Sequence, residues 1–275
     1  IYTGEDTLSL HDALPIFLRI PFRLGMDVFT TGKIGEERKD MVISSMKVFA
    51  QLMEIYGVEH YRACATSAMR DAQNGKEIID LVKQESGIQI EIISGDEEAT
   101  LIYENHVAEG LDKTFGYLYV DVGGGSTELT YYENGKMKYE HSFNIGTIRL
   151  LNNLVTKENW NEMKTEIKTK LIGKKPIVAI GSGGNINKVF SMSKTKDGKP
   201  MSANMLKTFY KDLKLLSVEE RMVKHNLRED RADVIVPALE IFNKILNWSN
   251  ISQIYVPKIS VADGLIHSIY DKLKK

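Results

Sequence analysis

The sequence predicts an α/β protein of two modest domains. At 275 residues the chain is long for a single hydrophobic core. Short runs rich in β-branched and aromatic residues alternate with longer runs whose apolar residues recur at helical spacing. The richest strand pattern, Tyr117 to Phe143, is interrupted by a glycine-rich turn and by Asn134-Gly135, a preferred hairpin turn. This stretch therefore predicts an antiparallel meander.

The first sixteen residues, Ile1 to Ile16, differ from the rest of the chain. They show no clear period and contain no initiator methionine. They resemble the in-frame translation of a sequencing-adapter remnant, so we interpret residues 1–16 as foreign and leave them out of the fold prediction. The alternative is a genuine, irregular N-terminus.

The structured pattern begins at Phe17. Phe17 to Phe29 predicts one or two strands, with Pro21 at an edge or a bulge. Glu36 to Tyr56 carries apolar residues near helical spacing and ends at Gly57, which predicts a long helix. A short strand is expected at Val58 to Thr66.

Arg70 stands in a loop of small residues, Ala65 to Ala72, directly after that strand. The carboxyl end of a strand is a usual ligand position in α/β folds. The planar fork of arginine donors suits phosphate, which makes Arg70 a candidate phosphate ligand. The alternative is that Arg70 pairs with Asp71 or another neighbouring acid.

Three acids open a later helix, which starts at Ser94 and runs to about His106. Asp96, Glu97 and Glu98 lie in its first turn, where negative charge complements the helix dipole. One of these carboxylates could instead point into a cleft as a general base. From the residues alone, both interpretations stay open.

The glycine-rich turn of the meander predicts a phosphate site. Gly123, Gly124 and Gly125 let the backbone approach a ligand closely and point successive N–H groups at an anion. Asp121 and Glu128 flank the turn, where a metal chelated by phosphate oxygens would sit. The turn opens a strand and no lysine follows it, so it is neither a Walker loop nor a dinucleotide fingerprint. The alternative is a hairpin whose glycines merely serve a tight turn.

A second glycine-rich turn, Gly181 to Asn185, joins a strand at Pro176 to Ile180 to a helix. Such a turn can hold an anion or a nucleotide ring at a helix N-terminus, but alone it is a weak motif. Arg149, in a turn into a helix, is a further anion contact or else a surface residue. The remaining predicted helices are Glu77 to Glu85, Lys157 to Leu171, Ala203 to Leu215, Val218 to His225, Arg231 to Asn247 and Val261 to Lys274, and the remaining strands are Ile88 to Ile93 and Ile251 to Val256.

The composition limits the classes of function. The chain has 36 Lys and Arg against 37 Asp and Glu, which argues against a protein that coats nucleic acid by bulk charge. A single cysteine, Cys64, excludes an internal disulfide and favours a reducing compartment. No apolar stretch approaches the roughly 20 residues of a membrane span, and no secretory leader is present. We therefore expect a cytoplasmic protein without membrane or nucleic-acid partners.

Five ordered motifs between Phe17 and Lys275 resemble those of the exopolyphosphatase / guanosine pentaphosphate phosphatase family, within the actin-like ATPase superfamily. They are similar to an arginine loop, a catalytic-acid motif, a second phosphate loop, the adenosine-type motif of the superfamily and a closing helix. In this order they occupy residues 65–72, 92–99, 121–129, 181–184 and 262–266. The closing helix has Ala-Asp-Gly where Arg-Glu-Gly is more usual.

The resemblance implies a fold of two ribonuclease-H-like (actin-like) α/β domains with an interdomain cleft. The first would comprise residues 17–115 and 259–275, and the second residues 116–258. It also implies Glu98 as the general base, Arg70 as a ligand of substrate phosphate, and Asp121 and Glu128 as the residues that position Mg²⁺ or another divalent cation. The terminal phosphoryl group would be cradled by Gly123, Gly124, Gly125, Ser126 and Thr127.

One departure from the family concerns its first phosphate loop. Family members begin with a strand and a loop of the form Asp-x-Gly-Ser-Asn-Ser, and nothing similar precedes Phe17. We therefore expect a truncated member whose first domain is incomplete. The native upstream codons should encode that loop, and a start codon just before Ile1 would contradict this expectation. The chain also lacks the long helical C-terminal extension of larger family members, so we expect the short form.

The implied function is hydrolytic release of terminal phosphate from inorganic polyphosphate, guanosine pentaphosphate or both. Dimerisation is common among relatives, so a homodimer is compatible with the resemblance. Two alternatives remain. One is an ATP-dependent phosphotransferase of the same superfamily, in which Gly181 to Gly184 would bind adenosine; the other is a non-catalytic sensor that binds guanosine alarmones or polyphosphate.

Overall fold

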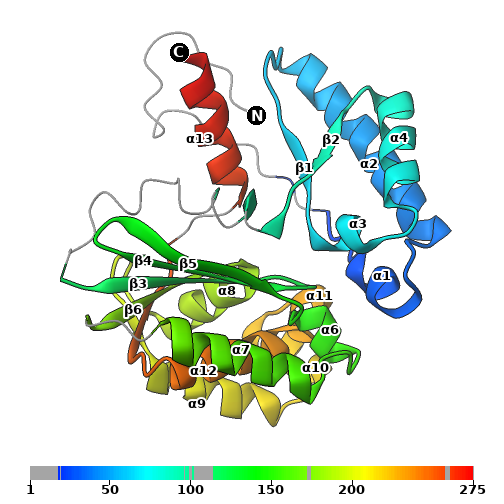
Figure 1. Cartoon of the computed structure of the whole chain (residues 1–275). Helices are drawn as coiled ribbons and strands as arrows, with labels where there is room; N and C mark the ends of the chain where they lie inside the picture. Colours follow the sequence, from blue (N-terminus) through cyan, green and yellow to red (C-terminus); the bar gives the residue numbers. More distant parts are fainter. Residues whose placement is uncertain are drawn as a thin grey trace. The chain divides into compact units, whose positions relative to one another are not determined.

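The computed structural model describes residues 18, 20–95, 97–98, 101, 114–171, 175–257 and 261–274. The chain divides into two compact units, one from Ile1–Ile93 with Ile269–Lys275 and the other from Ser94–Ser268. Figure 1 labels their helices and strands, which alternate as the α/β prediction requires. The interpretation of residues 1–16 and the position of Asp96 lie outside the described residues. The domain boundaries expected after residues 115 and 258 stay predictions.

The first unit contains a small parallel sheet. Strand β1 (Ala63–Ala65) pairs with β2 (Ile90–Ile92) along their full lengths. Helices α2 (Glu36–Ile55) and α4 (Gly75–Ser86) accompany these strands in Figure 1. A common core joins them, built from Val28, Ile34, Val42, Met69, Ile78, Val82 and Ile88.

The strands predicted between Phe17 and Phe29 are wrong, because the structure has helix α1 (Gly25–Thr31) in this stretch. Val28 is 4% exposed and belongs to the core. The Asp27 carboxylate accepts hydrogen bonds from the Gly35 N–H at 2.9 Å and from the Arg38 guanidinium at 2.5 Å. These tertiary contacts override the strand preference of the aromatic residues.

The loop predicted from Ala65 to Ala72 is largely a short helix, α3 (Ser67–Asp71). Met69 is buried, and a methyl group built on Gly75 would lie 2.3 Å from the Met69 carbonyl oxygen. The close approach of these backbones compacts the segment into a helical turn. Arg70 therefore projects from a helix rather than from a loop.

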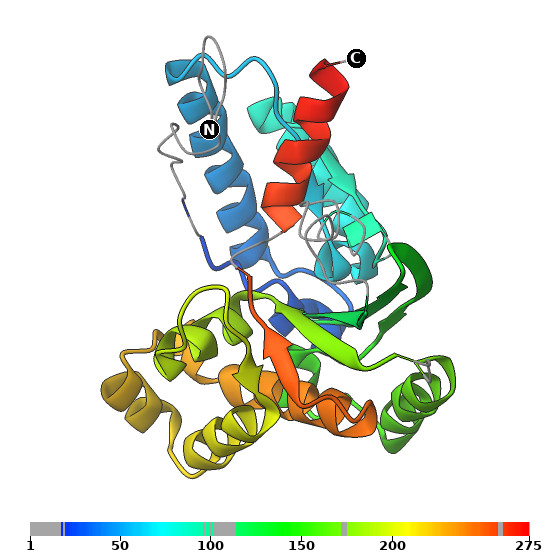
Figure 2. The same cartoon turned by 90° about the vertical axis from the view of Figure 1, so that its left-hand side faces the viewer.

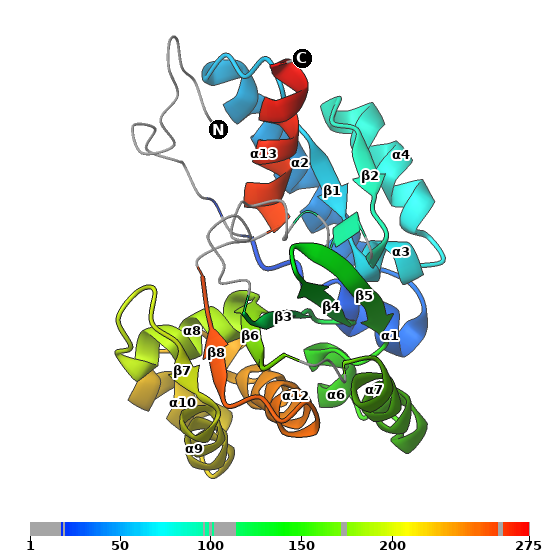
Figure 3. The same ribbon diagram turned by 60° about the vertical axis from the view of Figure 1, so that its left-hand side comes forward.

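The second unit is built on a six-stranded mixed sheet in the order β5-β4-β3-β6-β8-β7. Strands β3 (Gly116–Val122), β4 (Thr127–Glu133) and β5 (Lys136–Phe143) form the predicted antiparallel meander. Strands β6 (Ile177–Ser182) and β8 (Gln253–Tyr255) continue the sheet in parallel with β3, and β7 (Met201–Ser202) closes its edge (Figure 3). Strand β7 was not predicted.

A β-bulge interrupts the hairpin of β4 and β5. Asn134 and Gly135 have φ values of 56° and 70°, as the predicted type I′ turn requires. Next to the turn Tyr132 pairs with Met137, but Tyr131 pairs with Tyr139, so Lys138 has no partner on β4. The bulge shifts every later pair of the hairpin by one residue.

Eight further helices have defined bounds in the described residues; seven lie within the second unit, and the last begins in the second unit and ends in the first. The helix predicted from Arg231 to Asn247 is wrong as a single element, because the structure has two helices there. Pro237 lies in the first turn of the second of them, where its missing N–H costs nothing. The helices are α6 (Thr147–Leu151), α7 (Lys157–Lys170), α8 (Gly184–Ser193), α9 (Ala203–Lys214), α10 (Val218–His225), α11 (Glu229–Ala232), α12 (Ile235–Trp248) and α13 (Val261–Leu273).

The two faces of the large sheet have different surroundings. On β3, Leu118 and Val120 belong to the main core with residues of α7 and α12, which lie on one side of the sheet in Figures 1 and 2. Tyr117 and Tyr119 alternate with them and belong to a separate cluster on the opposite face. Asp121 follows the same alternation, so its side chain lies on the face of Tyr117 and Tyr119. The face that carries Asp121 is therefore the one turned away from α7 and α12.

No helix in the described part of the chain is long and apolar enough to cross a membrane.

Candidate functional site

Four polar side chains form a row across four strands of the large sheet. Asp121 on β3 pairs with Glu128 on β4, and Glu128 pairs in turn with Ser142 on β5. On its other side, Asp121 pairs with Ser182 on β6. Directly paired residues point to the same face of a sheet. We call Ser142, Glu128, Asp121 and Ser182 the carboxylate row.

Glu128 is 4% exposed and is held by two hydroxyl groups. Its Oε1 accepts hydrogen bonds from Oγ of Ser126 at 2.5 Å and from Oγ of Ser142 at 2.9 Å. A buried carboxylate requires such donors, because desolvation of the charge is otherwise costly. The two serines therefore fix the orientation of this carboxylate.

Asp121 lies beside Glu128 in a desolvated environment. Burial raises the pKa of Asp121, while hydrogen bonds from the Ser182 side chain and from the Val122 backbone act in the opposite direction. Gly183 closes over this carboxylate, since a methyl group built there would lie 3.1 Å from Oδ1 of Asp121. Two adjacent carboxylates in such a place repel each other, and a bound cation would relieve that repulsion.

The turn between β3 and β4 presents backbone donors. The Gly123 N–H donates to the Ser126 carbonyl at 3.0 Å, which leaves Gly124 and Gly125 at the tip. No described residue accepts a hydrogen bond from the N–H groups of Gly124, Gly125 or Ser126. Successive N–H groups of this kind form an anion-binding concavity. The turn thus has the donors that the phosphate-site prediction needs.

The carbonyl groups of the turn are bound by the next helix. The carbonyls of Gly123 and Gly124 accept from the N–H groups of Thr147 at 3.0 Å and Ile148 at 2.9 Å. Nε of Arg149 donates to the Gly125 carbonyl at 2.7 Å. Arg149 is therefore a support of the turn rather than a surface residue.

A left-handed backbone does not explain the glycines of this turn, but lack of space explains Gly124. None of the three has a positive φ. A methyl group built on Gly124 would lie 3.0 Å from Cδ1 of Ile148, and one on Gly146 would lie 2.3 Å from the Gly124 carbonyl oxygen. Thr127 is fully buried, and its hydroxyl donates to the Ile145 carbonyl at 2.5 Å. The hydroxyl of Thr127 is thus engaged within the fold.

The helix that carries Glu98 begins beside the carboxylate row. Ser94 caps it, accepting the Glu97 N–H on Oγ at 3.0 Å and the Glu98 N–H on its carbonyl at 3.0 Å. A methyl group built on Gly95 would lie 2.9 Å from Cβ of Ser142 and 3.8 Å from Oε1 of Glu128. Glu98, partly buried, stands one helical turn further on. Its role as a base stays a prediction.

Arg70 belongs to the first unit, whereas the carboxylate row belongs to the second. Nη1 of Arg70 donates to the carbonyl of Ile93 at 2.7 Å, just beyond the end of β2. Arg70 forms no ion pair with a residue that the structure describes, so the expected alternative of pairing with Asp71 is not seen. Its contact with phosphate stays a prediction.

The residues that could hold a cation are Asp121 and Glu128. Among the described residues no group of three or more His, Cys, Asp or Glu is arranged to hold a metal. A pair of carboxylates nevertheless fits Mg²⁺, which keeps several waters and binds through one or two carboxylates together with substrate phosphates. The two adjacent carboxylates, one of them with a pKa raised by burial, are consistent with such a cation.

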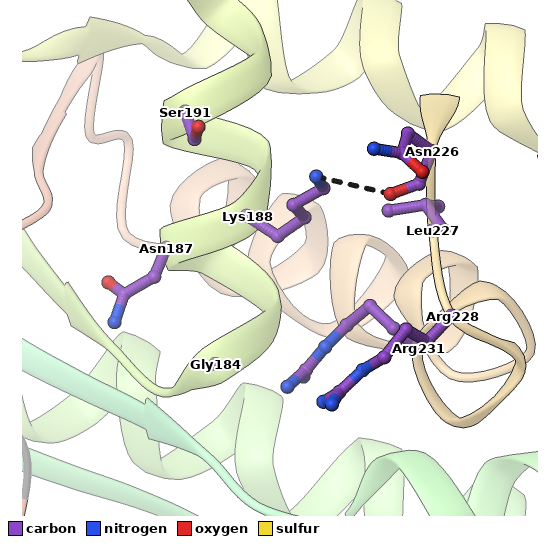
Figure 4. A pocket seen from close by; sticks show the side chains of 8 residues that line it. All are labelled: Gly184, Asn187, Lys188, Ser191, Asn226, Leu227, Arg228 and Arg231. Carbon is purple, nitrogen blue, oxygen red and sulfur yellow. Dashed lines mark hydrogen bonds between the residues drawn. The ribbon is translucent and has the colours of Figure 1, made fainter. Parts of the chain in front are cut away.

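The second glycine-rich turn leads to a basic pocket, shown in Figure 4. The pocket has a volume of about 410 Å³, and its cations are Lys188, Arg228 and Arg231. Nη1 of Arg231 donates to Oδ1 of Asn185 at 2.8 Å, and burial lowers the pKa of Arg231. Sequence reasoning missed these cations, because Asp230 and Asp233 stand among them and hide any local excess of positive charge. The other lining residues are Gly184, Asn187, Ser191, Asn226 and Leu227.

Comparison with known proteins decides the family. The sequence model of the Ppx/GppA phosphatase family matches residues 18–273. The chain belongs to this family. Its α/β fold of two actin-like domains, predicted from the sequence, is thereby confirmed, since solved Ppx/GppA structures align over most of the chain.

Three relatives illustrate the range of the Ppx/GppA family. The chain is 26% identical over 245 residues to a guanosine-5'-triphosphate,3'-diphosphate pyrophosphatase of Vibrio cholerae, covering 84% of this chain and 49% of the relative. The solved Ppx/GppA structure from Aquifex aeolicus has 27% identity and a TM-score of 0.71, covering 92% of this chain and 88% of that one. The exopolyphosphatase structure from Cytophaga hutchinsonii has 25% identity and a TM-score of 0.75, with coverages of 88% and 85%. The chain spans about half the length, or less, of several curated relatives it matches.

Proposed function

We propose that this Ppx/GppA chain is a hydrolase that releases the terminal phosphate of inorganic polyphosphate, guanosine pentaphosphate or both. The observation that carries the proposal is the carboxylate row beside a turn with available N–H donors. Phosphoryl transfer depends mainly on positioning and on neutralising the charge of the phosphoryl group. The two carboxylates of the row and the turn supply a cation-binding pair and anion-binding donors within one stretch of eight residues, 121–128.

Each predicted site residue has a role in this proposal. Glu98 accepts a proton from the attacking water, and Arg70 binds substrate phosphate. The turn from Gly123 to Thr127 holds the terminal phosphoryl group through its backbone. Asp121 and Glu128 hold the divalent cation, which when bound would neutralise charge on the phosphate oxygens.

The basic pocket at α8 supports a substrate with further negative charge. Lys188, Arg228 and Arg231 can each donate to phosphate, and arginine can do so through two N–H groups at once. Both a polyphosphate chain and the phosphates of a guanosine nucleotide meet this requirement. The near balance of charge and the single cysteine support a cytoplasmic location without nucleic-acid partners, and homodimerisation stays an expectation from the resemblance.

The proposal is tested by phosphate release from each substrate in the presence of Mg²⁺. Release from polyphosphate or guanosine pentaphosphate without an acceptor supports a hydrolase, and the ratio of the two rates identifies the preferred substrate. Activity that requires ATP and an acceptor would instead indicate a phosphotransferase. Micromolar binding without turnover would indicate a sensor. Either of the last two results would overturn the proposal.

A further inference from the structure

The carboxylate row has the same arrangement at both of its ends. The two carboxylates lie on the central strands β3 and β4, and one serine lies outside each of them, on β6 and β5. Ser142 donates to Oε1 of Glu128 at 2.9 Å. Ser182 is paired with Asp121 across the strands, and its side chain acts to lower the pKa of that carboxyl group. Each carboxylate therefore has a hydroxyl partner on the neighbouring strand.

Ser142 reaches Glu128 because of the β-bulge. Counted back from the pair Glu133 and Lys136, a regular ladder would place His141 beside Glu128. The unpaired residue, Lys138, shifts the register so that Ser142 stands there instead. A one-residue shift in a strand exchanges the side chains that face each side of the sheet. The irregularity thus determines which donor the carboxylate receives.

Ser182 lies beside Asp121 at the end of the regular ladder of β3 and β6, and an irregular residue follows it. Gly183, the next residue, has φ 101° and ψ 154°, a backbone conformation essentially restricted to glycine. This conformation ends β6 and starts α8 while keeping Ser182 in register with Asp121. Backbone departures of this kind cluster at functional sites. The place of the Ser142 hydroxyl therefore depends on a local departure from regular structure, and Ser182 lies directly before another.

We propose that Ser142 and Ser182 are positioning residues for the divalent cation, holding the carboxylates of Glu128 and Asp121 in the orientation that binds it. This inference rests on the cation of the proposed function. Removal of a residue that hydrogen-bonds to a metal-binding carboxylate typically lowers metal affinity by about 10- to 100-fold. The serines act through the carboxylates and not by contact with the substrate.

The test measures cation binding without substrate. Binding of Mn²⁺ is titrated by the electron paramagnetic resonance signal of the free ion, for the wild type, Ser142→Ala and Ser182→Ala. Each variant should raise the Mn²⁺ dissociation constant by about tenfold. Competition with Ca²⁺ gives a second readout. The loss of affinity should be smaller for Ca²⁺ than for Mn²⁺, because Ca²⁺ tolerates flexible geometry whereas a small octahedral cation does not.

Ser252→Ala is the matched control, because Ser252 is an exposed serine next to β8 of the same sheet. It should leave the Mn²⁺ dissociation constant unchanged. Thermal unfolding without cation checks that each variant is folded. Ser182 is 4% exposed, so its alanine variant carries the greater risk of misfolding. Ser142 is only partly buried, so Ser142→Ala tests the positioning role of Ser142 even if Ser182→Ala does not fold.

The outcomes separate this inference from the proposed function. Weaker Mn²⁺ binding in folded Ser142→Ala supports the inference even if the wild type releases no phosphate, a result that would overturn only the proposed function. Unchanged Mn²⁺ affinity in that variant, or an equal loss for Mn²⁺ and Ca²⁺, overturns the positioning role while leaving hydrolysis intact. A wild type that binds no Mn²⁺ overturns the inference as well.

Discussion

The two glycine-rich turns of the second unit end neighbouring parallel strands but differ in construction. The turn Gly123 to Ser126 joins two strands, has no positive φ, and leaves three N–H groups without a described acceptor. The turn Gly181 to Gly184 joins a strand to a helix and needs φ 101° at Gly183. Its Ser182 is paired with Asp121 on one side, and its Gly184 lies against Arg231 on the other.

This difference indicates a division of roles. The first turn lies with the carboxylate row, where a reacting phosphoryl group and a cation would be held. The second turn supports Asp121 and leads into the basic pocket, where more distant charges of the substrate would bind. Changes near the first turn should therefore reduce turnover, and changes near the second should weaken binding or stability. The following predictions test this comparison.

The largest effect is expected at Glu98. Glu98→Gln should lower kcat by about 10²-fold or more, with KM little changed, because a general base acts in the chemical step. Steady-state phosphate release measures both quantities. Glu97→Gln is the matched control, since Glu97 is the exposed neighbour in the same helical turn. If both variants retained wild-type turnover, Glu98 would not be the base.

The next effect concerns the backbone of the second turn. Gly183→Ala should destabilise the protein by about 1–3 kcal/mol, because alanine must adopt a conformation essentially restricted to glycine. Its methyl group would also press on Asp121 at 3.1 Å. Denaturant unfolding measures the free energy change. Gly198→Ala is the control: Gly198 has φ 75° with open space around it, so only the cost of the left-handed backbone remains, about 1 kcal/mol. Equal losses of unfolding free energy in the two variants would contradict the proposed crowding at Gly183.

A smaller, kinetic effect is expected in the basic pocket. Arg231→Gln should raise KM by about tenfold and leave kcat nearly unchanged, since a hydrogen bond to a charged group contributes roughly 1.5–3 kcal/mol. Lys211→Gln on α9 removes one exposed charge outside the pocket and should leave KM unchanged. A fall in kcat without a rise in KM would break the proposed division between the two turns.

The smallest effect concerns pH and stability at Asp121. Because folding raises the pKa of Asp121, the folded protein holds that proton more tightly than the unfolded chain, and stability falls as pH rises between the two pKa values. Asp121→Asn removes this loss of stability. In cation-free buffer at pH 7 the Tm of the variant should therefore exceed that of the wild type by on the order of 2 °C. The gain should shrink toward about pH 4, near the pKa of an unfolded aspartate. A lower Tm at pH 7 would contradict the prediction.

The fold was predictable where local signals agree with tertiary packing. The meander and its Asn134-Gly135 turn are confirmed, because strand pattern and turn type point to the same hairpin. Helix α1 was not predicted, since burial of Val28 and the contacts of Asp27 are tertiary. The division between α11 and α12 did have a sequence signal, because Pro237 is favourable in a first turn and costly in a helix interior.

The site was predictable only in part. Asp121 and Glu128 are equidistant from the tip of the first turn, so their pairing follows from the hairpin itself. The place of Ser142 beside Glu128 could not be predicted from the Asn134-Gly135 turn, because the bulge replaces His141 by Ser142 in the register. Arg228 and Arg231 gave no signal, since their clustering with Lys188 depends on the packing of α8 beside α11.

The bulge at Lys138 also bears on how the hairpin can change in length during evolution. Loss of Lys138 would restore a regular ladder while Tyr131 still faces Tyr139 and Glu128 still faces Ser142. A single-codon gap at this position is therefore expected to be neutral for the site. A gap between Tyr139 and Ser142 would instead remove the serine from its place beside Glu128. Alignments of related sequences should tolerate the first kind of gap and exclude the second.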